Sequence, residues 1–427
     1  MIDNKLIRNT GFVFVAGIVN KLFSLVAIAY TARVLGKADF GFYTLIGTFT
    51  FLFSYFGNFG IGPMTIKEIS RNKTKVHELF NHIISLRLCL IVFSFPILIL
   101  IVNLLDYRED IKYLILIAGF SSLFSTFSDS FNTLYIAFER FKVPSLISVL
   151  ISFLSSISNI LILYFGYGLK GIVMISFIGA LLGAVVSGLW VRQRFFKYKF
   201  AFNFHIWKDL IYRSLPFSIV TFLQQGRMYL NILFLSKLPG PLPGEVAIGY
   251  YYPASSLCQV ALMLSNSFRQ AALPTMASNA SDIKIIQRII NKSTKVLLFI
   301  VILPLIIFTT FFPEKIITII YGNEYLPSAS TLTILGWAYA FMIFNTPVTV
   351  ALFAVEEIRG FIPWAILLFC INIALIVPLI LNYSFLGVAI AFLISGIIDT
   401  VVRNYLLRTF LGIKNLKIGD VDKENIY

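Results

Sequence analysis

The chain has 427 residues, of which 58% are hydrophobic and only 13% are charged, and its mean hydropathy is +0.86. Soluble domains carry about 25% charged residues, and water could not cover this much apolar surface. The composition therefore excludes a cytosolic enzyme, a secreted disulfide scaffold and a nucleic-acid-binding module, and it predicts an all-α integral membrane protein. The net charge of +15 is interpreted first as a signal of membrane topology.

About twelve apolar segments are long enough to cross a bilayer. A helix needs about 20 mostly apolar residues to span a hydrocarbon core of about 30 Å. The first segment is longer than a signal-peptide core, so we expect it to be a spanning helix. The expected spans are, in chain order, 7–31, 40–62, 83–105, 112–136, 145–166, 171–191, 214–236, 246–272, 291–312, 328–354, 360–381 and 385–408.

The Lys and Arg residues are distributed unevenly between the two sides of the membrane. Of the 35, 25 fall at the two ends of the chain and in alternate connections, Arg269 among them, and seven fall on the opposite side. Cytoplasmic connections carry the excess of Lys and Arg, which predicts a multi-pass protein of the cytoplasmic (inner) membrane with both termini in the cytoplasm. The remaining three, Lys21, Arg87 and Arg227, lie inside expected spans.

The connection 192–213 is basic and aromatic, which is typical of a segment that lies on the cytoplasmic membrane surface. It divides the chain into a six-helix lobe at 1–191 and a second at 214–408, and a cytoplasmic tail follows at 409–427. Two six-span lobes that each start and end in the cytoplasm would be parallel repeats related by an axis along the membrane normal.

Several segments resemble a known family. ARVLGKADFGFYTL at 32–45, followed by FGIGPMTIKEISRNK at 59–73, resembles the amino-terminal signature of the polysaccharide-biosynthesis flippases. These proteins export O-antigen and related lipid-linked oligosaccharides, and they belong to the multidrug/oligosaccharidyl-lipid/polysaccharide (MOP) superfamily. Looser similarities follow in the expected order, in RSLPFSIVTFLQQ at 213–225, VAIGYYYPASSL at 246–257 and IITIIYGNEYLPSASTLTILGW at 316–337.

The resemblance implies two six-helix lobes around a central cavity. It also implies alternating access that carries an undecaprenyl-type diphosphate oligosaccharide from the inner to the outer leaflet. The seventh span departs from the family pattern, because it reads GRMYLNILFL where many relatives place an acidic residue shortly after the basic one.

The basic residues within the spans are candidates for binding an anion, since a charge near the bilayer centre costs at least about 2.5–3.5 kcal/mol. Lys21 follows Arg8 by 13 residues and Arg227 follows Arg213 by 14, so both lie about 20 Å from the cytoplasmic interface. Facing cations in a water-filled cavity suit a diphosphate headgroup, although neutralisation by a carboxylate or by helix carbonyls is the alternative. Arg87 either lines a substrate entrance or extends to the cytoplasmic surface.

Three amides accompany Arg227 in the seventh span. Helical offsets place Gln224 and Asn231 on roughly its face, and Gln225 is adjacent. These side chains are candidates for binding sugar hydroxyls, and the alternative is that they join helices by hydrogen bonds.

Two acids lie within the expected spans. Asp129, about 15 Å from the cytoplasmic end, is the candidate for coupling to H⁺ or Na⁺, unless it only pairs with Lys21 or Arg87. Asp399 and Arg403 are four residues apart and are expected to pair with each other.

Motifs for metal or nucleotide chemistry are absent from the sequence, since it contains no HExxH, CxxC or GxxxxGK[ST] pattern. We therefore expect a transporter that is not an enzyme, without a cofactor, that translocates an anionic lipid-linked oligosaccharide. The alternatives are an ion-coupled multidrug exporter of the same superfamily and a polysaccharide polymerase or ligase. The expected partners are this substrate, membrane lipids and polysaccharide assembly proteins, with no nucleic acid.

Overall fold

The computed structural model describes residues 2–62, 64–65, 69, 76–138, 142–194, 199–278, 282–354 and 358–411. Residues 195–198 of the expected linker and the expected tail from 412 onward lie outside these ranges. The described residues form helices and no strand. This follows from the composition, because a segment surrounded by lipid must satisfy its backbone N–H and C=O groups internally.

The helices cross the molecule twelve times, as the sequence predicts. Eight helices are long and apolar enough to span a bilayer, and two of them break once, at Gly36 (φ 70°) and Ser384 (φ 50°), so that each crosses twice. The less apolar α9 and the α7–α8 pair supply the other two crossings. The elements are α1 Ile2–Asn58, α3 Val76–Leu104, α4 Glu109–Ala137, α5 Lys142–Tyr164, α6 Gly168–Arg194, α7 Phe204–Thr221, the π-helical segment η1 Phe222–Gly226, α8 Arg227–Lys237, α9 Gly244–Ser278, α10 Ile283–Leu297, the π-helical segment η2 Leu298–Ile302, α11 Leu303–Phe311, α12 Pro313–Tyr321, the 3₁₀ turn η3 Asn323–Tyr325, α13 Ser328–Phe344, α14 Thr346–Ala354 and α15 Ile358–Leu411.

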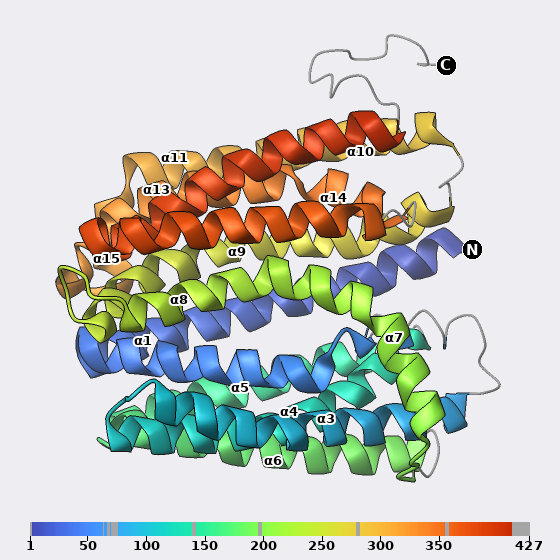
Figure 1. The fold of residues 1–427 in the computed structure, drawn as a ribbon, viewed down its shortest axis with the longest axis horizontal. Helices are drawn as coiled ribbons and strands as arrows, with labels where there is room; N and C mark the ends of the chain where they lie inside the picture. Colours follow the sequence, from blue (N-terminus) through green and yellow to red (C-terminus); the bar gives the residue numbers. More distant parts are fainter. Residues whose placement is uncertain are drawn as a thin grey trace.

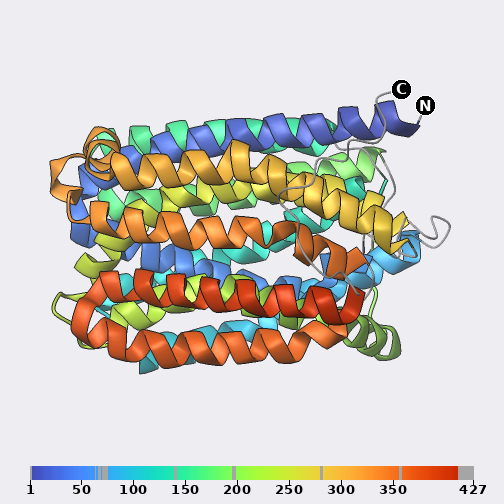
Figure 2. The ribbon, with the colours of Figure 1, turned by 90° about the horizontal axis from the view of Figure 1, so that it is seen from above.

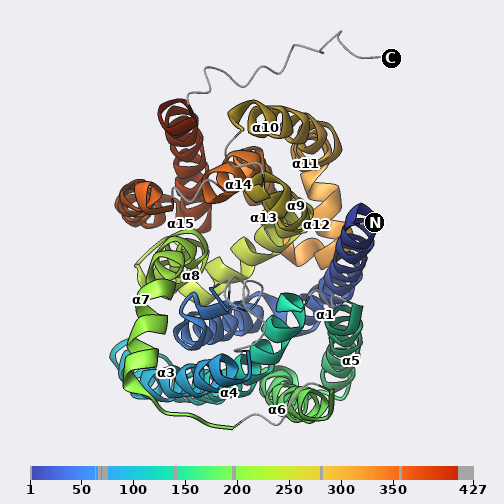
Figure 3. The ribbon, with the colours of Figure 1, turned by 90° about the vertical axis from the view of Figure 1, so that its right-hand side faces the viewer.

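The helices form two groups that lie side by side, as the end-on view of Figure 3 shows. We call α1–α6 the N-lobe and α7–α15 the C-lobe. In the N-lobe, α4 packs on α3 and α6, and in the C-lobe, α13 packs on α9 and α15. α1 joins the lobes through its packing against α9. The start of α1 and the end of α15 lie at the same end of the molecule, which we call the inner end (Figures 1 and 2).

Helix α7 lies across the inner end of the N-lobe before the chain turns into α8 (Figure 1). Asn203 caps its N-terminus by accepting hydrogen bonds from the backbone N–H groups of His205 and Ile206. Leu210 is buried against the N-lobe, whereas Lys208 on the same helix is exposed. This amphipathic character suits a position along a membrane surface.

The opposite, outer end of the lobe interface is closed by hydrogen bonds between the lobes. The Tyr325 hydroxyl donates to the carbonyl oxygen of Ala32 at 2.7 Å, and the Arg33 guanidinium donates to carbonyl oxygens of α12. The hydroxyl oxygens of Tyr107 in the N-lobe and Ser236 in the C-lobe lie 2.7 Å apart. These contacts join the two lobes on the outer side of the molecule.

Candidate functional site

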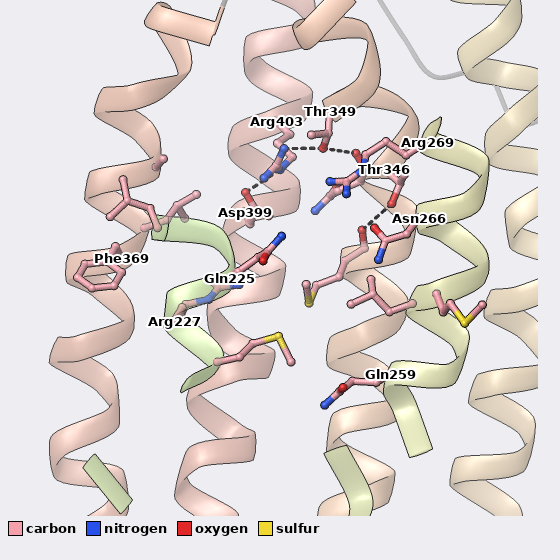
Figure 4. A pocket seen from close by; sticks show the side chains of 18 of the residues that line it. Gln225, Arg227, Gln259, Asn266, Arg269, Thr346, Thr349, Phe369, Asp399 and Arg403 are labelled. Carbon is pink, nitrogen blue, oxygen red and sulfur yellow. Dashed lines mark hydrogen bonds and ion pairs between the residues drawn. The ribbon is translucent and has the colours of Figure 1, made fainter. Parts of the chain in front are cut away.

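A cavity of about 410 Å³ lies in the C-lobe beside α1 (Figure 4). Its walls come from η1, α8, α9, α13, α14 and α15, and Lys21 of α1 is the one N-lobe residue that lines it. Four basic side chains and one carboxylate line this cavity, namely Lys21, Arg227, Arg269, Arg403 and Asp399. The cavity therefore carries an excess of positive charge.

Arg227 is the most buried of the cavity cations that have no close ionic partner among the described residues. Its side chain begins α8, directly after the π-helical segment, and its guanidinium carbon lies 5.0 Å from the centre of the Phe392 ring. Among the described residues the guanidinium has no hydrogen-bond acceptor, and its interaction with the Asp399 carboxylate is only electrostatic. A buried guanidinium in this state is available to bind an anion from the cavity.

Lys21 and Arg269 reach the same cavity from different helices. Lys21 lies on α1, partly buried, and Arg269 lies on α9, also partly buried. Within the described part of the chain, neither side chain has a hydrogen bond or an ion pair. Figure 4 shows Arg269 beside Thr346 and near Arg403, at the end of the cavity that faces the inner end of the molecule.

Asp399 and Arg403 form the pair that their spacing predicts. Arg403 Nε donates to Asp399 Oδ1 at 2.8 Å, and both side chains are buried. A second guanidinium nitrogen, Nη1, donates to the Thr349 hydroxyl of α14 at 2.6 Å. The acid of the cavity, Asp399, is thus held by an arginine, and the described residues offer no bonded carboxylate to Arg227, Arg269 or Lys21.

The predicted amides are separated by the structure. Gln225 lines the cavity, whereas Asn231 is almost fully buried and is not part of its wall. The side chain of Gln224 lies outside the described ones. The offset from Gln224 to Arg227 is not α-helical, because it lies partly in the π-helical segment Phe222–Gly226, which has a wider turn, whereas the offset from Arg227 to Asn231 lies within α8.

Arg87 and Asp129 lie away from the cavity, in the N-lobe. Arg87 is 1% exposed and donates from Nη1 to the Ser130 hydroxyl at 3.0 Å. Asp129 interacts electrostatically with Arg87 and lies within hydrogen-bonding reach of the side chains of Asn58 and Asn132. The structure therefore groups the predicted site residues into a cationic cavity in the C-lobe and a separate Arg87–Asp129 cluster.

Arg269 is a cavity cation that the sequence does not single out. Its position in the sequence groups it with the cytoplasmic charges, but α9 places its side chain in the cavity wall with Asn266 and Gln259. The signal was present, since these three polar residues follow one another at intervals of seven and three along α9. Such intervals place side chains on one face of a helix.

Comparison with known proteins places the chain in a family. The sequence profile described as "Polysaccharide biosynthesis protein" matches residues 6–280. The chain belongs to this family. It is 22% identical over 411 residues to the capsular polysaccharide biosynthesis protein CapF of Staphylococcus aureus, covering 94% of the chain and 99% of CapF. It is 23% identical over 403 residues to a proposed O-antigen transporter of Shigella flexneri, covering 90% and 93% of the two chains.

Solved structures share the fold of this family member. A multidrug resistance transporter of the MATE family and MOP superfamily, in an inward-facing conformation, superposes with a TM-score of 0.75 at 14% identity, covering 92% of the chain and 94% of that structure. The lipid II flippase MurJ in an inward closed conformation gives a TM-score of 0.72 at 19% identity, covering 95% and 87%. The chain thus has the twelve-helix fold of the MOP superfamily.

Proposed function

We propose that the protein is a flippase that moves a polyprenyl diphosphate-linked oligosaccharide across the cytoplasmic membrane for surface polysaccharide assembly. The observation that carries this proposal is the buried Arg227 guanidinium, which lines the cavity and has no hydrogen-bond acceptor among the residues that the structure describes. The family and the names of the relatives, CapF and an O-antigen transporter, support this substrate class.

The charges of the cavity favour an anionic ligand. Removing an arginine from water is costly unless a partner compensates it, and no carboxylate in the described part of the chain bonds to Arg227, Arg269 or Lys21. A diphosphate offers several acceptor oxygens and two or more negative charges, which match the planar fork of arginine and the point charge of lysine. A ligand of this kind would compensate all three cations at once.

The same charges argue against the multidrug exporter. A cavity that attracts organic cations needs free carboxylates, and the carboxylate of Asp399 is already bonded to Arg403 at 2.8 Å. The fold alone cannot decide between the two functions, because the MATE transporter and MurJ share it.

Alternating access would move the substrate. The outer ends of the lobes are joined, for example by Tyr325 and Ala32, so the lobes would separate there to release the substrate outward. We assign the inner end to the cytoplasm, following the excess of Lys and Arg at this end, which puts both termini in the cytoplasm. Asp129, with Asn58 and Asn132 around it, would be the site of H⁺ or Na⁺ coupling.

Export of surface polysaccharide in cells tests the proposal. Lys21→Ala and Arg227→Ala should each abolish export while the protein still reaches the membrane. Lys284→Ala, which removes an exposed cation of α10 outside the cavity, should leave export intact. Full export by both cavity variants would contradict the proposed function.

A further inference from the structure

The cavity differs in character along its length. The labelled charged side chains of α9 and α15, Arg269, Arg403 and Asp399, lie closer to the inner end than Arg227 does (Figure 4). On the outer side of Arg227, α8 contributes the uncharged side chains of Met228 and Tyr229, and α9 contributes Gln259. Lys21 lines the cavity from α1.

The ring of Tyr229 is held in place by an aromatic contact. Its ring stacks on that of Phe51 from the N-lobe, with ring centres 3.6 Å apart and planes inclined by 13°. Phe51 covers one face of the Tyr229 ring, and Tyr229 still lines the cavity. The face of an aromatic ring carries partial negative charge, so it attracts the weakly positive C–H groups on one face of a pyranose.

Gln259 places a hydrogen-bonding group on the outer side of Arg227 as well. Its Nε2 donates to the Ser255 hydroxyl at 3.3 Å, and Ser255 in turn contacts the Tyr339 hydroxyl at 3.3 Å. These bonds hold the amide in place, and its carbonyl oxygen has no partner among the described residues. Figure 4 shows the amide extending into the cavity on the outer side of Arg227. An aromatic ring and a fixed amide that line the same cavity are a combination that suits a sugar.

We propose that Tyr229 and Gln259 form a sugar-binding subsite on the outer side of the cavity arginines. The sugar would lie deepest in the cavity, and the diphosphate would lie behind it against Arg227 and Arg269. This order agrees with the chemistry of the substrate, in which the diphosphate lies between the lipid tail and the sugar. With the tail in the inner leaflet, the sugar enters the cavity first and the diphosphate follows it. The inference rests on the proposed function and adds to it a direction of binding.

Binding of two lipids to the full chain in nanodiscs tests the subsite. The probes are undecaprenyl diphosphate and the same lipid carrying one N-acetylhexosamine. The native protein should bind the glycosylated lipid about tenfold more tightly, which corresponds to about 1.4 kcal/mol. Tyr229→Leu should remove this difference and retain the affinity for the bare diphosphate. Tyr229→Phe, which keeps the stacked ring, should retain the difference.

Further variants separate the possible results. Gln259→Leu should reduce the difference between the lipids, and Tyr164→Leu, at an exposed position on α5, should leave it unchanged. Arg227→Gln should weaken both lipids alike. Equal affinities of the native protein for the two lipids would overturn the subsite. An equal loss of affinity for both lipids in Tyr229→Leu would also overturn it, since Tyr229 would then only join the lobes. Binding of neither lipid would instead contradict the proposed function.

Discussion

Gly41 and Gly249 pack reciprocally where the two lobes meet near their outer ends. A Cβ atom on Gly41 of α1 would overlap the carbonyl oxygen of Glu245 on α9, and a Cβ atom on Gly249 of α9 would overlap that of Lys37 on α1. Each glycine thus contacts the residue four positions before the other. The absence of side chains at these two positions lets the backbones of α1 and α9 approach closely.

A larger residue at either glycine should open the outer end. Gly41→Val and Gly249→Val should each destabilise the closed contact by about 1–3 kcal/mol through overpacking. A cysteine placed at Gln259 in the cavity should then react faster with an impermeant thiol reagent added outside. Gly47→Val on the same helix is the matched control, because a Cβ there would meet no atom within 4 Å. Equal labelling of Gly41→Val and Gly47→Val would show that the Gly41 contact does not keep the outer end closed.

Arg269 should contribute to binding of the diphosphate. Arg269→Gln removes a cation from the cavity wall and should weaken undecaprenyl diphosphate binding by about tenfold, the effect of one charge-assisted hydrogen bond. Arg288→Gln on α10, where the arginine is exposed, should have no effect. An unchanged affinity in Arg269→Gln would show that the ligand does not reach this part of the cavity.

Replacing one partner of the buried Asp399–Arg403 pair should destabilise the protein more than replacing both. Asp399→Leu leaves a buried arginine uncompensated and should cost about 3–5 kcal/mol of stability. The double variant Asp399→Leu with Arg403→Met should regain most of this loss, measured by thermal unfolding in detergent. Asp209→Leu breaks an exposed pair with Arg213 on α7 and should cost less than about 1 kcal/mol. A similar loss in Asp399→Leu and Asp209→Leu would be inconsistent with this account.

Asp129 should carry the ion dependence of transport. Asp129→Asn removes the charge but keeps the size of the side chain, so it should lower the ion-dependent part of transport in vesicles while the fold persists. Asp209→Asn, on the exposed face of α7, serves as the control. Transport by Asp129→Asn with the ion dependence of the native protein would remove Asp129 from the coupling mechanism.

The spans could be predicted from the sequence because the bilayer fixes both their length and their internal hydrogen bonding. The pairing of Asp399 and Arg403 was predictable for a similar reason, since it depends only on the spacing within one helix. Lys21 and Arg227 also share one cavity, as their depths in the first span of each lobe suggested.

Other parts of the site depend on geometry that composition does not reveal. The expected span 246–272 places Arg269 near a membrane interface, but α9 has 35 residues and is about 52 Å long, so its register against the cavity is set by packing on α1 and α13. The π-helical segment Phe222–Gly226 rotates the face of the seventh span that reaches the cavity. Gln259 and Tyr229, which lie on different helices, line one cavity only through the tertiary structure.

Translocation in proteoliposomes tests directly whether Lys21 and Arg227 are needed to move the lipid diphosphate. The native protein and the variants Lys21→Gln and Arg227→Gln would be compared for movement of an undecaprenyl diphosphate-linked oligosaccharide from one leaflet to the other. We expect rapid translocation by the native protein, loss of translocation in both variants, and partial activity in Arg227→Lys, which keeps the charge. Translocation by Lys21→Gln and Arg227→Gln at the native rate would contradict this expectation.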